Sequence, residues 1–175
     1  STPYRDTSQP LKKWLNKCKV VPLGVDVERF GGAANSQASK DSLQVLAVGR
    51  LTYYKGFRYL IEAAAQIPGI HINLVGHGDQ AEQLESLVAS LKLQDRVTFH
   101  GILRNDELAQ KMVDCDCLCL PSIERTEAFG MVLLEAMYFG KATVISDVEG
   151  SGMGWVVDDN ITGIKVKPAD ADALT

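Results

Sequence analysis

The chain has 175 residues, of which 46% are hydrophobic and 23% are charged, and 18 Lys and Arg residues face 22 Asp and Glu residues, giving a net charge of −4. A chain of this length buries roughly 70% of its unfolded surface, which is enough for one complete core. The composition excludes a disordered tail and a disulfide-stabilised miniprotein. The acidic balance argues against a general nucleic-acid binder, and no apolar run approaches the roughly 20 residues that span a bilayer.

From residue 43 onward, apolar β-rich runs alternate with amphipathic segments. The expected strands cover residues 43–48, 70–75, 96–100, 115–120, 142–146 and 162–166. The expected helices cover residues 57–66, 80–91, 106–113, where Asn105 is the expected cap, and 129–139. Near-continuous apolar strands separated by helices are typical of a parallel sheet covered on both faces. The sequence therefore predicts an α/β fold with a Rossmann-like, doubly wound parallel sheet.

The first 42 residues lack this alternation. We expect a short helix at 11–17, a short strand at 18–21 and a polar connector rich in Gly, Ala and Ser at 31–42. Residues 1–42 are therefore predicted to be an interdomain segment, and residues 43–175 the Rossmann-like domain. Because the chain begins at Ser1 and stops at Thr175 within an apparent helix start, we expect a piece of a longer protein with a truncated C terminus.

Three of the four cysteines follow a C-x-C-x-C pattern at Cys115, Cys117 and Cys119, and the fourth is Cys18. Within a strand, this spacing places the three thiols on one face of the sheet. Zinc sites normally need a second pair of ligands, which this sequence lacks. We therefore expect small buried side chains and no metal site, and the free thiols favour a reducing compartment.

The loop after the first expected strand carries two cations, Arg50 and Lys55. Its spacing does not fit a Walker A loop. Two cations at the carboxyl end of a strand, just before a helix, are suited to an anionic group such as a pyrophosphate. The alternative, that both side chains lie on a solvated surface, stays open at this point.

The loop after the fourth expected strand leads into a helix whose first amides belong to Gly130, Met131 and Val132. Such amides form an anion site without any side chain. Glu127 precedes this helix, and Glu135 lies within its apolar run, where a carboxylate needs polar partners. Ribose hydroxyls would be such partners. The alternatives are a helix-capping role for Glu127 and an internal salt bridge for Glu135.

A lone G-x-G, Gly76-His77-Gly78, follows the second expected strand and is too short for a dinucleotide-binding motif. It predicts a tight turn, and a solvated loop position is expected for His77. His71 and His100 fall within strands and are expected to be structural. From its residues alone, the chain is predicted to bind a nucleoside diphosphate, with two acidic residues directed to a sugar.

Several motifs occur in one order along the chain: V-V-P-L-G-V-D (20–26), G-R-L-x-x-x-K-G (49–56), L-V-G-H-G-D (74–79), F-H-G (99–101), P-S-x-E-R-x-E-A-F-G-x-V-x-L-E-A-M (121–137) and T-G-I-K-V (162–166). This order resembles the C-terminal, donor-binding domain of retaining GT-B-fold glycosyltransferases of family 4 (group 1). The resemblance covers essentially the whole chain. Its most specific element is the E-x₇-E pair, Glu127 and Glu135.

The resemblance implies a role for each candidate residue. Arg50 and Lys55 would hold the donor's diphosphate and stabilise the leaving nucleotide without a metal ion, and Glu127 would contact the transferred sugar near its anomeric centre. Glu135 would bind the ribose hydroxyls. The remaining nucleotide contacts would come from the amides of Gly130, Met131 and Val132 to the phosphates, and from the loops at Gly76, His77 and Gly101 to the base. No cofactor is implied beyond the donor substrate, a UDP- or GDP-sugar.

By the same resemblance, the enzyme would be a hexosyltransferase that acts with retention on a glycan or lipid-linked acceptor. It would be cytoplasmic, with peripheral membrane association of the full-length protein as an option, and would bind no nucleic acid. Because the N-terminal acceptor domain is absent, we expect the isolated fragment to be inactive. The segment 149–154 departs from the family's G-G-x-x-E pattern. The alternatives are a non-catalytic nucleotide-binding or interaction domain and a GT-B-fold nucleotide-sugar epimerase.

Overall fold

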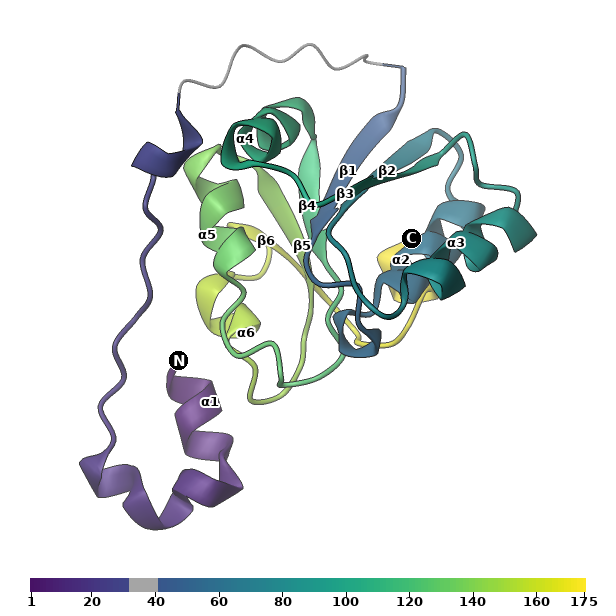
Figure 1. Cartoon of the computed structure of the whole chain (residues 1–175). Coiled ribbons are helices and arrows are strands. Elements are labelled where there is room, and N and C mark those ends of the chain that lie inside the picture. The colour runs from purple at the N-terminus through teal and green to yellow at the C-terminus, as the bar shows by residue number, and fades with distance from the viewer. Residues whose placement is uncertain (32–40) are drawn as a thin grey trace.

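The computed structural model describes residues 1–31 and 41–175. At its centre is a six-stranded sheet with strand order β3-β2-β1-β4-β5-β6 (Figure 1). The strands are β1 (Leu43–Val48), β2 (Ile70–Val75), β3 (Val97–Gly101), β4 (Cys117–Leu120), β5 (Ala142–Ser146) and β6 (Gly163–Val166). All neighbouring strands are parallel, which confirms the predicted doubly wound Rossmann-like sheet.

Helices cover both faces of this sheet. One face is covered by α2 (Phe57–Gln66) and α3 (Ala81–Ser90). The other is covered by α4 (Asn105–Asp114), α5 (Met131–Tyr138) and α6 (Met153–Val156), and Figure 1 shows the two groups on opposite sides. Side chains of β1 alternate between the two cores: Val45 and Ala47 pack on the α2 side, and Leu46 packs on the α4 side. Because successive side chains of a strand point to opposite faces of the sheet, β1 contributes to both cores.

The cysteine prediction is wrong for one of the three clustered thiols. Strand β4 begins at Cys117, and Cys115 lies before it, at the end of α4. Cys117 and Cys119 pack on the α2 side of the sheet, whereas Cys115 packs in the core under α4 and α5. Burial raises the pKa of Cys115 to about 12 and that of Cys117 to about 11, and it also raises the pKa of Cys119. Cys115 and Cys119 are therefore buried and Cys117 is half-buried, and all three thiols have little thiolate character.

Three further local predictions need correction. Helix α4 begins at Asn105, so the N-cap is Arg104, whose backbone N–H donates to Glu107 Oε2 at 2.9 Å. Helix α5 begins at Met131 and not at residue 129. Residues 18–21 are extended but form no strand, because no strand within residues 1–31 and 41–175 pairs with them. The helices α1 (Thr2–Thr7) and α6 were not predicted.

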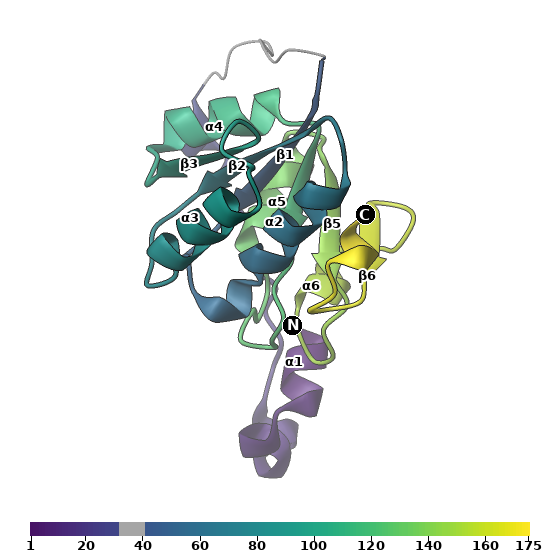
Figure 2. The same cartoon turned by 90° about the vertical axis from the view of Figure 1, so that its right-hand side faces the viewer.

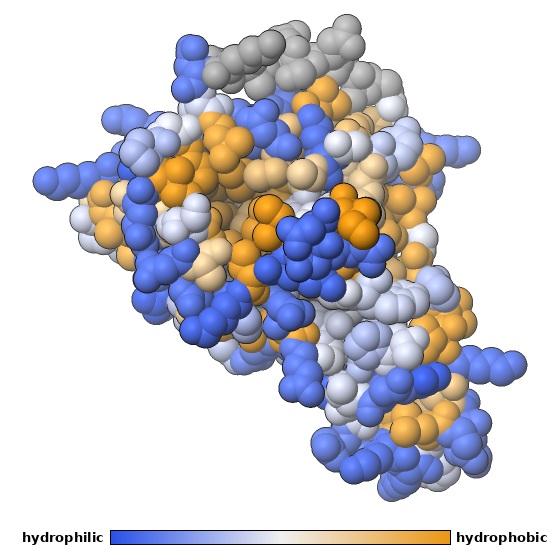
Figure 3. Space-filling model, turned by 180° about the vertical axis from the view of Figure 1, so that it is seen from behind, coloured by the Kyte–Doolittle hydropathy of each residue, from blue (hydrophilic) through white to orange (hydrophobic). Residues whose placement is uncertain are grey.

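The amino-terminal segment lies outside the sheet domain for most of its described length. It contains α1, the 3₁₀ helix η1 (Gln9–Lys17) and the short turn η2 (Glu28–Phe30). Figures 1 and 2 show α1 and η1 projecting from the body near α6, while η2 returns to the side of α4 and α5. Seen from behind, this projection carries apolar patches (Figure 3). Trp14 of η1 is exposed, as are Val21 and Leu23 in the segment that follows η1. Most of the predicted connector, residues 32–40, lies outside the described residues.

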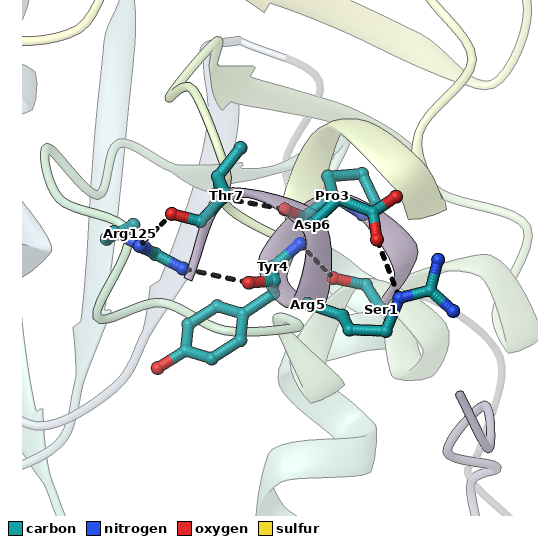
Figure 4. Close-up of polar contacts among 7 residues, drawn as sticks. All are labelled: Ser1, Pro3, Tyr4, Arg5, Asp6, Thr7 and Arg125. Atoms are coloured by element: carbon teal, nitrogen blue, oxygen red, sulfur yellow. Dashed lines mark hydrogen bonds and ion pairs between the residues drawn. The ribbon is translucent and has the colours of Figure 1, made fainter. Parts of the chain in front are cut away.

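Helix α1 is attached to the loop between β4 and α5 by Arg125 (Figure 4). The guanidinium donates to the carbonyl oxygens of Tyr4 at 2.9 Å and Thr7 at 3.1 Å, and its carbon lies 4.6 Å from the centre of the Tyr4 ring. Carbonyls in the last turn of a helix have no partner within the helix, and a cation there is favourable. Arg125 therefore joins the amino-terminal segment to a loop of the sheet domain. Among the described residues, no helix is long and apolar enough to cross a membrane.

Candidate functional site

A cleft of about 490 Å³ opens at the carboxyl ends of β1 and β4, where the order of the strands reverses. This switch point is where open α/β sheets bind ligands, and the volume falls within the range of small-molecule sites. The lining comes from the loop after β1, the loop between β4 and α5, the first turns of α4 and α5, and η2. The lining residues are Arg29, Val48, Gly49, Lys55, Asn105, Leu108, Thr126, Glu127, Ala128, Phe129, Gly130, Met131, Val132 and Glu135.

The amino terminus of α5 forms one wall of this cleft. Gly130 is its N-cap, with a φ of 79°, and an added Cβ would lie 2.8 Å from Leu133 Cδ1, so only glycine fits without strain. The first N–H bonded within the helix is that of Leu133, which donates to Gly130 O at 2.9 Å. Within the described part of the chain, the N–H groups of Gly130, Met131 and Val132 have no partner. They can bind an anion in the cleft.

An ion pair crosses the switch point between Lys55 Nζ and Glu127 Oε2. Only 11% of the Lys55 side chain and 12% of the Glu127 side chain are exposed, so the pair is largely desolvated. Ser122 Oγ also donates to Glu127 Oε2 at 3.1 Å. The alternatives of a solvated Lys55 and a helix-capping Glu127 are therefore wrong in this structure, since Glu127 bonds two side chains and Gly130 is the cap of α5.

The backbone of the loop that carries Glu127 is held from two sides. Ser151 Oγ donates to the carbonyl oxygen of Glu127, and it accepts from the N–H of Met153 at 3.2 Å. On the other side, Ile123 N–H donates to Tyr54 O at 2.7 Å. The segment 149–154, which departs from the family pattern, thus supports the loop that carries Glu127.

Glu135 lies in α5 and forms an ion pair with Arg29 of η2. The Glu135 side chain is 10% exposed and the Arg29 side chain 35% exposed, and both residues line the cleft. The internal salt bridge that the sequence left as an alternative is therefore present, with its carboxylate at the wall of the cleft. Sequence reasoning missed Arg29, because residues 1–42 are predicted to be an interdomain segment outside the Rossmann-like domain. The one available signal was the adjacent Phe30, an aromatic residue within a polar segment.

Four of the predicted site residues do not line this cleft. Arg50 is exposed and lies on the loop just after β1. Gly76 directly follows β2 and Gly101 ends the neighbouring strand β3, and Gly76 N–H donates to Gly101 O at 2.8 Å. His77 is exposed, and its carbonyl oxygen accepts from Leu51 N–H at 3.0 Å. The cleft therefore gathers Lys55, Glu127, the α5 amides and Glu135 from the predicted set, while the roles of the other four residues stay predictions.

Among the described residues, the charged side chains that line the cleft are two cations and two carboxylates, joined as Lys55–Glu127 and Arg29–Glu135. Their formal charges cancel within each pair. At the amino terminus of α5, no described side chain accepts a hydrogen bond from the free amides, so the partial positive charge of the helix remains available to a ligand. An anion that also offers hydroxyl groups would satisfy both the amides and the carboxylates.

Known proteins are similar to this chain in sequence and in fold. Residues 33–175 match the family described as glycosyl transferases, group 1. The protein named uncharacterized glycosyltransferase MJ1607, from Methanocaldococcus jannaschii, is 36% identical over 137 residues, which cover 77% of this chain and 34% of that protein.

Two solved structures superpose on the fold. Sucrose-phosphate synthase from Thermosynechococcus elongatus has a TM-score of 0.80 and 32% identity, over 94% of this chain and 44% of that one. HepE (Alr3699) of Anabaena, in complex with UDP and glucose, has a TM-score of 0.71 and 29% identity, over 77% of this chain and 37% of that one. The chain thus spans less than half the length of these relatives. With its Rossmann-like sheet and the family match over residues 33–175, the chain belongs to the group 1 glycosyl transferases.

Proposed function

We propose that this chain is the C-terminal, donor-binding domain of a GT-B glycosyltransferase that moves a hexose from a UDP- or GDP-sugar to an acceptor with retention of configuration. The observation that carries the proposal is the gathering of Lys55, Glu127 and Glu135 on one cleft, beside the free amides of α5. Each of these groups suits a different part of a nucleotide sugar.

The diphosphate would lie between Lys55 and the α5 amides. A lysine ammonium has three donors, so Lys55 can keep its bond to Glu127 and still donate to a phosphate oxygen. Charge builds up on the diphosphate as the sugar leaves, and a cation fixed in a partly dry cleft stabilises that charge without reorganisation. Lys55 and the amides would do this in place of a metal ion, with Arg50 joining from the rim.

The ribose would lie at Glu135 and the transferred sugar at Glu127. Carboxylates accept hydrogen bonds from vicinal hydroxyls, and both side chains line the same cleft. The HepE complexes with UDP and with UDP-glucose support a nucleotide sugar as the ligand class. The base would extend toward the carboxyl ends of β2 and β3, near Gly76, His77 and Gly101.

The rest of the reaction would depend on a second domain. A glycan or lipid-linked acceptor would bind there, in a cytoplasmic enzyme with peripheral membrane contact. The proposal of a second domain agrees with the lengths of the relatives, since the chain covers less than half of each of them. On its own, the 175-residue chain would bind donor weakly and transfer no sugar.

Binding of nucleotides to the chain tests the proposal. Saturation-transfer NMR with UDP, GDP, ADP and NAD should give a signal for one nucleoside diphosphate. The double variant Arg50→Ala/Lys55→Ala should lose it, while Arg58→Ala, at an exposed residue of α2 that does not line the cleft, should keep it. The double variant should weaken diphosphate binding much more than nucleoside binding. Equal losses for UDP and uridine would contradict the phosphate assignment, and a preference for NAD would overturn the proposal.

Two isosteric variants then separate the carboxylates. Glu135→Gln should weaken nucleotide binding, whereas Glu127→Gln should spare it and abolish transfer in the full-length enzyme. Equal losses of nucleotide affinity would contradict this division of roles. A full-length protein that binds the nucleotide but transfers no sugar would favour the non-catalytic alternative, and interconversion of free nucleotide sugars would favour the epimerase.

A further inference from the structure

The cleft contains a cation that comes from the amino-terminal segment. Arg29 belongs to η2, 106 residues before its partner Glu135 in the chain. The next residue, Phe30, is 1% exposed and packs against the rings of Tyr138 and Phe139, with centroid distances of 5.8 Å and 5.3 Å. These contacts fix η2 against the end of α5, and Figure 1 shows the turn beside α4 and α5. Arg29 is therefore held at the cleft by a buried anchor.

The guanidinium itself has a defined position. Its carbon lies 4.6 Å from the centre of the Phe30 ring, and the backbone of the turn is held by a bond from Glu28 N–H to Asp26 Oδ1 at 3.1 Å. Among the residues that the structure describes, Arg29 Nη2 donates to Glu135 Oε1. Glu135 Oε2 has no hydrogen-bond partner among residues 1–31 and 41–175. One carboxylate oxygen is thus occupied, and the other is left for a ligand.

We propose that Arg29 is a positioning residue: by holding Oε1 of Glu135, it aims Oε2 at the ribose hydroxyls and so sets the preference for ribonucleotides over deoxyribonucleotides. This inference rests on the proposed function. A glutamate side chain has three rotatable bonds, and without Arg29 the carboxylate could turn toward water at the mouth of the cleft. A bidentate-capable guanidinium fixes a carboxylate better than an ammonium or an amide does.

The experiment measures the ratio of two affinities. NMR titrations give Kd for UDP and GDP and for their 2′-deoxy forms, with the wild-type chain, Arg29→Gln, Arg29→Lys and the control Arg58→Gln. Arg58 forms the same type of ion pair, with Glu62, on the outer surface of α2. Arg29→Gln should reduce the ribo-to-deoxy preference by about tenfold, the scale of one hydrogen bond to a charged group. Arg29→Lys should restore part of the preference, and Arg58→Gln should leave it unchanged.

A second background shows whether Arg29 acts through Glu135. In a Glu135→Gln chain, adding Arg29→Gln should not change the ribo-to-deoxy ratio any further. If Arg29→Gln weakened the binding of the ribo and deoxy forms equally, the inference would be overturned, since this result would indicate a direct phosphate contact or a loss of fold. Tighter binding by Arg29→Gln would also overturn it, since Arg29 would then compete with the ligand for Glu135. A wild-type chain that binds no nucleoside diphosphate would instead contradict the proposed function, and the inference with it.

Discussion

Lys55 and Glu127 join the two loops that flank the switch point of the sheet. Lys55 follows β1 and Glu127 follows β4, 72 residues apart in the chain, and their charged groups form an ion pair that is nearly nine-tenths buried. A buried pair of this kind tolerates the loss of one partner poorly, because the remaining charge is left without compensation.

Breaking this pair from one side should therefore cost stability. Lys55→Met and Glu127→Gln should each lower the free energy of unfolding by about 3 kcal/mol. This value is the lower end of the range for breaking a buried ion pair, since the Lys55–Glu127 pair borders an open cleft. The double variant should lose clearly less than the sum of the two single losses. Urea unfolding of the four proteins measures this coupling. Additive losses would show that the two side chains do not interact in solution.

The close approach of the loops after β1 and β2 depends on Gly76. Its φ is 138°, and an added Cβ would lie 1.9 Å from Gly49 O. Gly76→Ala should lower the free energy of unfolding by about 3 kcal/mol, the upper range for an overpacked site. Gly69→Ala is the matched control, since Gly69 has a φ of 75° but no atom within 4 Å of the added Cβ. Thermal unfolding of both variants checks the difference, and equal destabilisation would contradict the steric argument.

Two strand histidines should make stability depend on pH. Burial, followed by the charge of Lys111, lowers the pKa of His71 and of His100 below the ordinary value of about 6.5. Below pH 6.5, the unfolded chain therefore binds more protons than the folded one. Stability should be greatest above pH 6.5 and fall on acidification toward the lower folded pKa values.

Urea unfolding at several pH values between 7.5 and 5 measures this slope. The variant His71→Gln/His100→Gln should flatten it, and Lys111→Gln should reduce it in part. His100 Nε2 lies 2.8 Å from Asn73 Oδ1 and His71 Nε2 lies 2.9 Å from Thr98 Oγ1, so glutamine can replace these contacts. A slope that the double variant leaves intact would assign the pH dependence to other groups.

Arg125 should control how firmly the amino-terminal segment is attached. Arg125→Ala removes the donors to Tyr4 O and Thr7 O (Figure 4). The free energy that holds the segment to the domain should fall by about 1.5 kcal/mol, the lower value for a hydrogen bond to a charged group. Tryptic cleavage after Lys12, Lys13 and Lys17 should then be roughly tenfold faster. Arg58→Ala is the control and should leave the cleavage rate unchanged. Cleavage of Arg125→Ala at the wild-type rate would show that α1 is held by other contacts.

The sequence by itself determined the architecture and much of the cleft. The alternation of apolar runs and amphipathic segments, as in Val45, Leu46 and Ala47, depends only on neighbours along the chain, and it predicted the parallel sheet and its helices. The spacing of Glu127, Gly130 and Glu135 is also local, since all three belong to one loop and the helix that follows it. These features follow from the periods of strands and helices.

Only the tertiary structure decided which groups meet. Arg29 reaches Glu135 because Phe30 is buried beside α5, whereas Arg50 remains outside the cleft although Lys55, on the same loop, lies in it. Cys115 and Cys117 pack in different cores because β4 starts at Cys117, two residues after the start of the expected strand. Such contacts join residues up to 106 positions apart. They are set by strand order and packing, which no local period encodes.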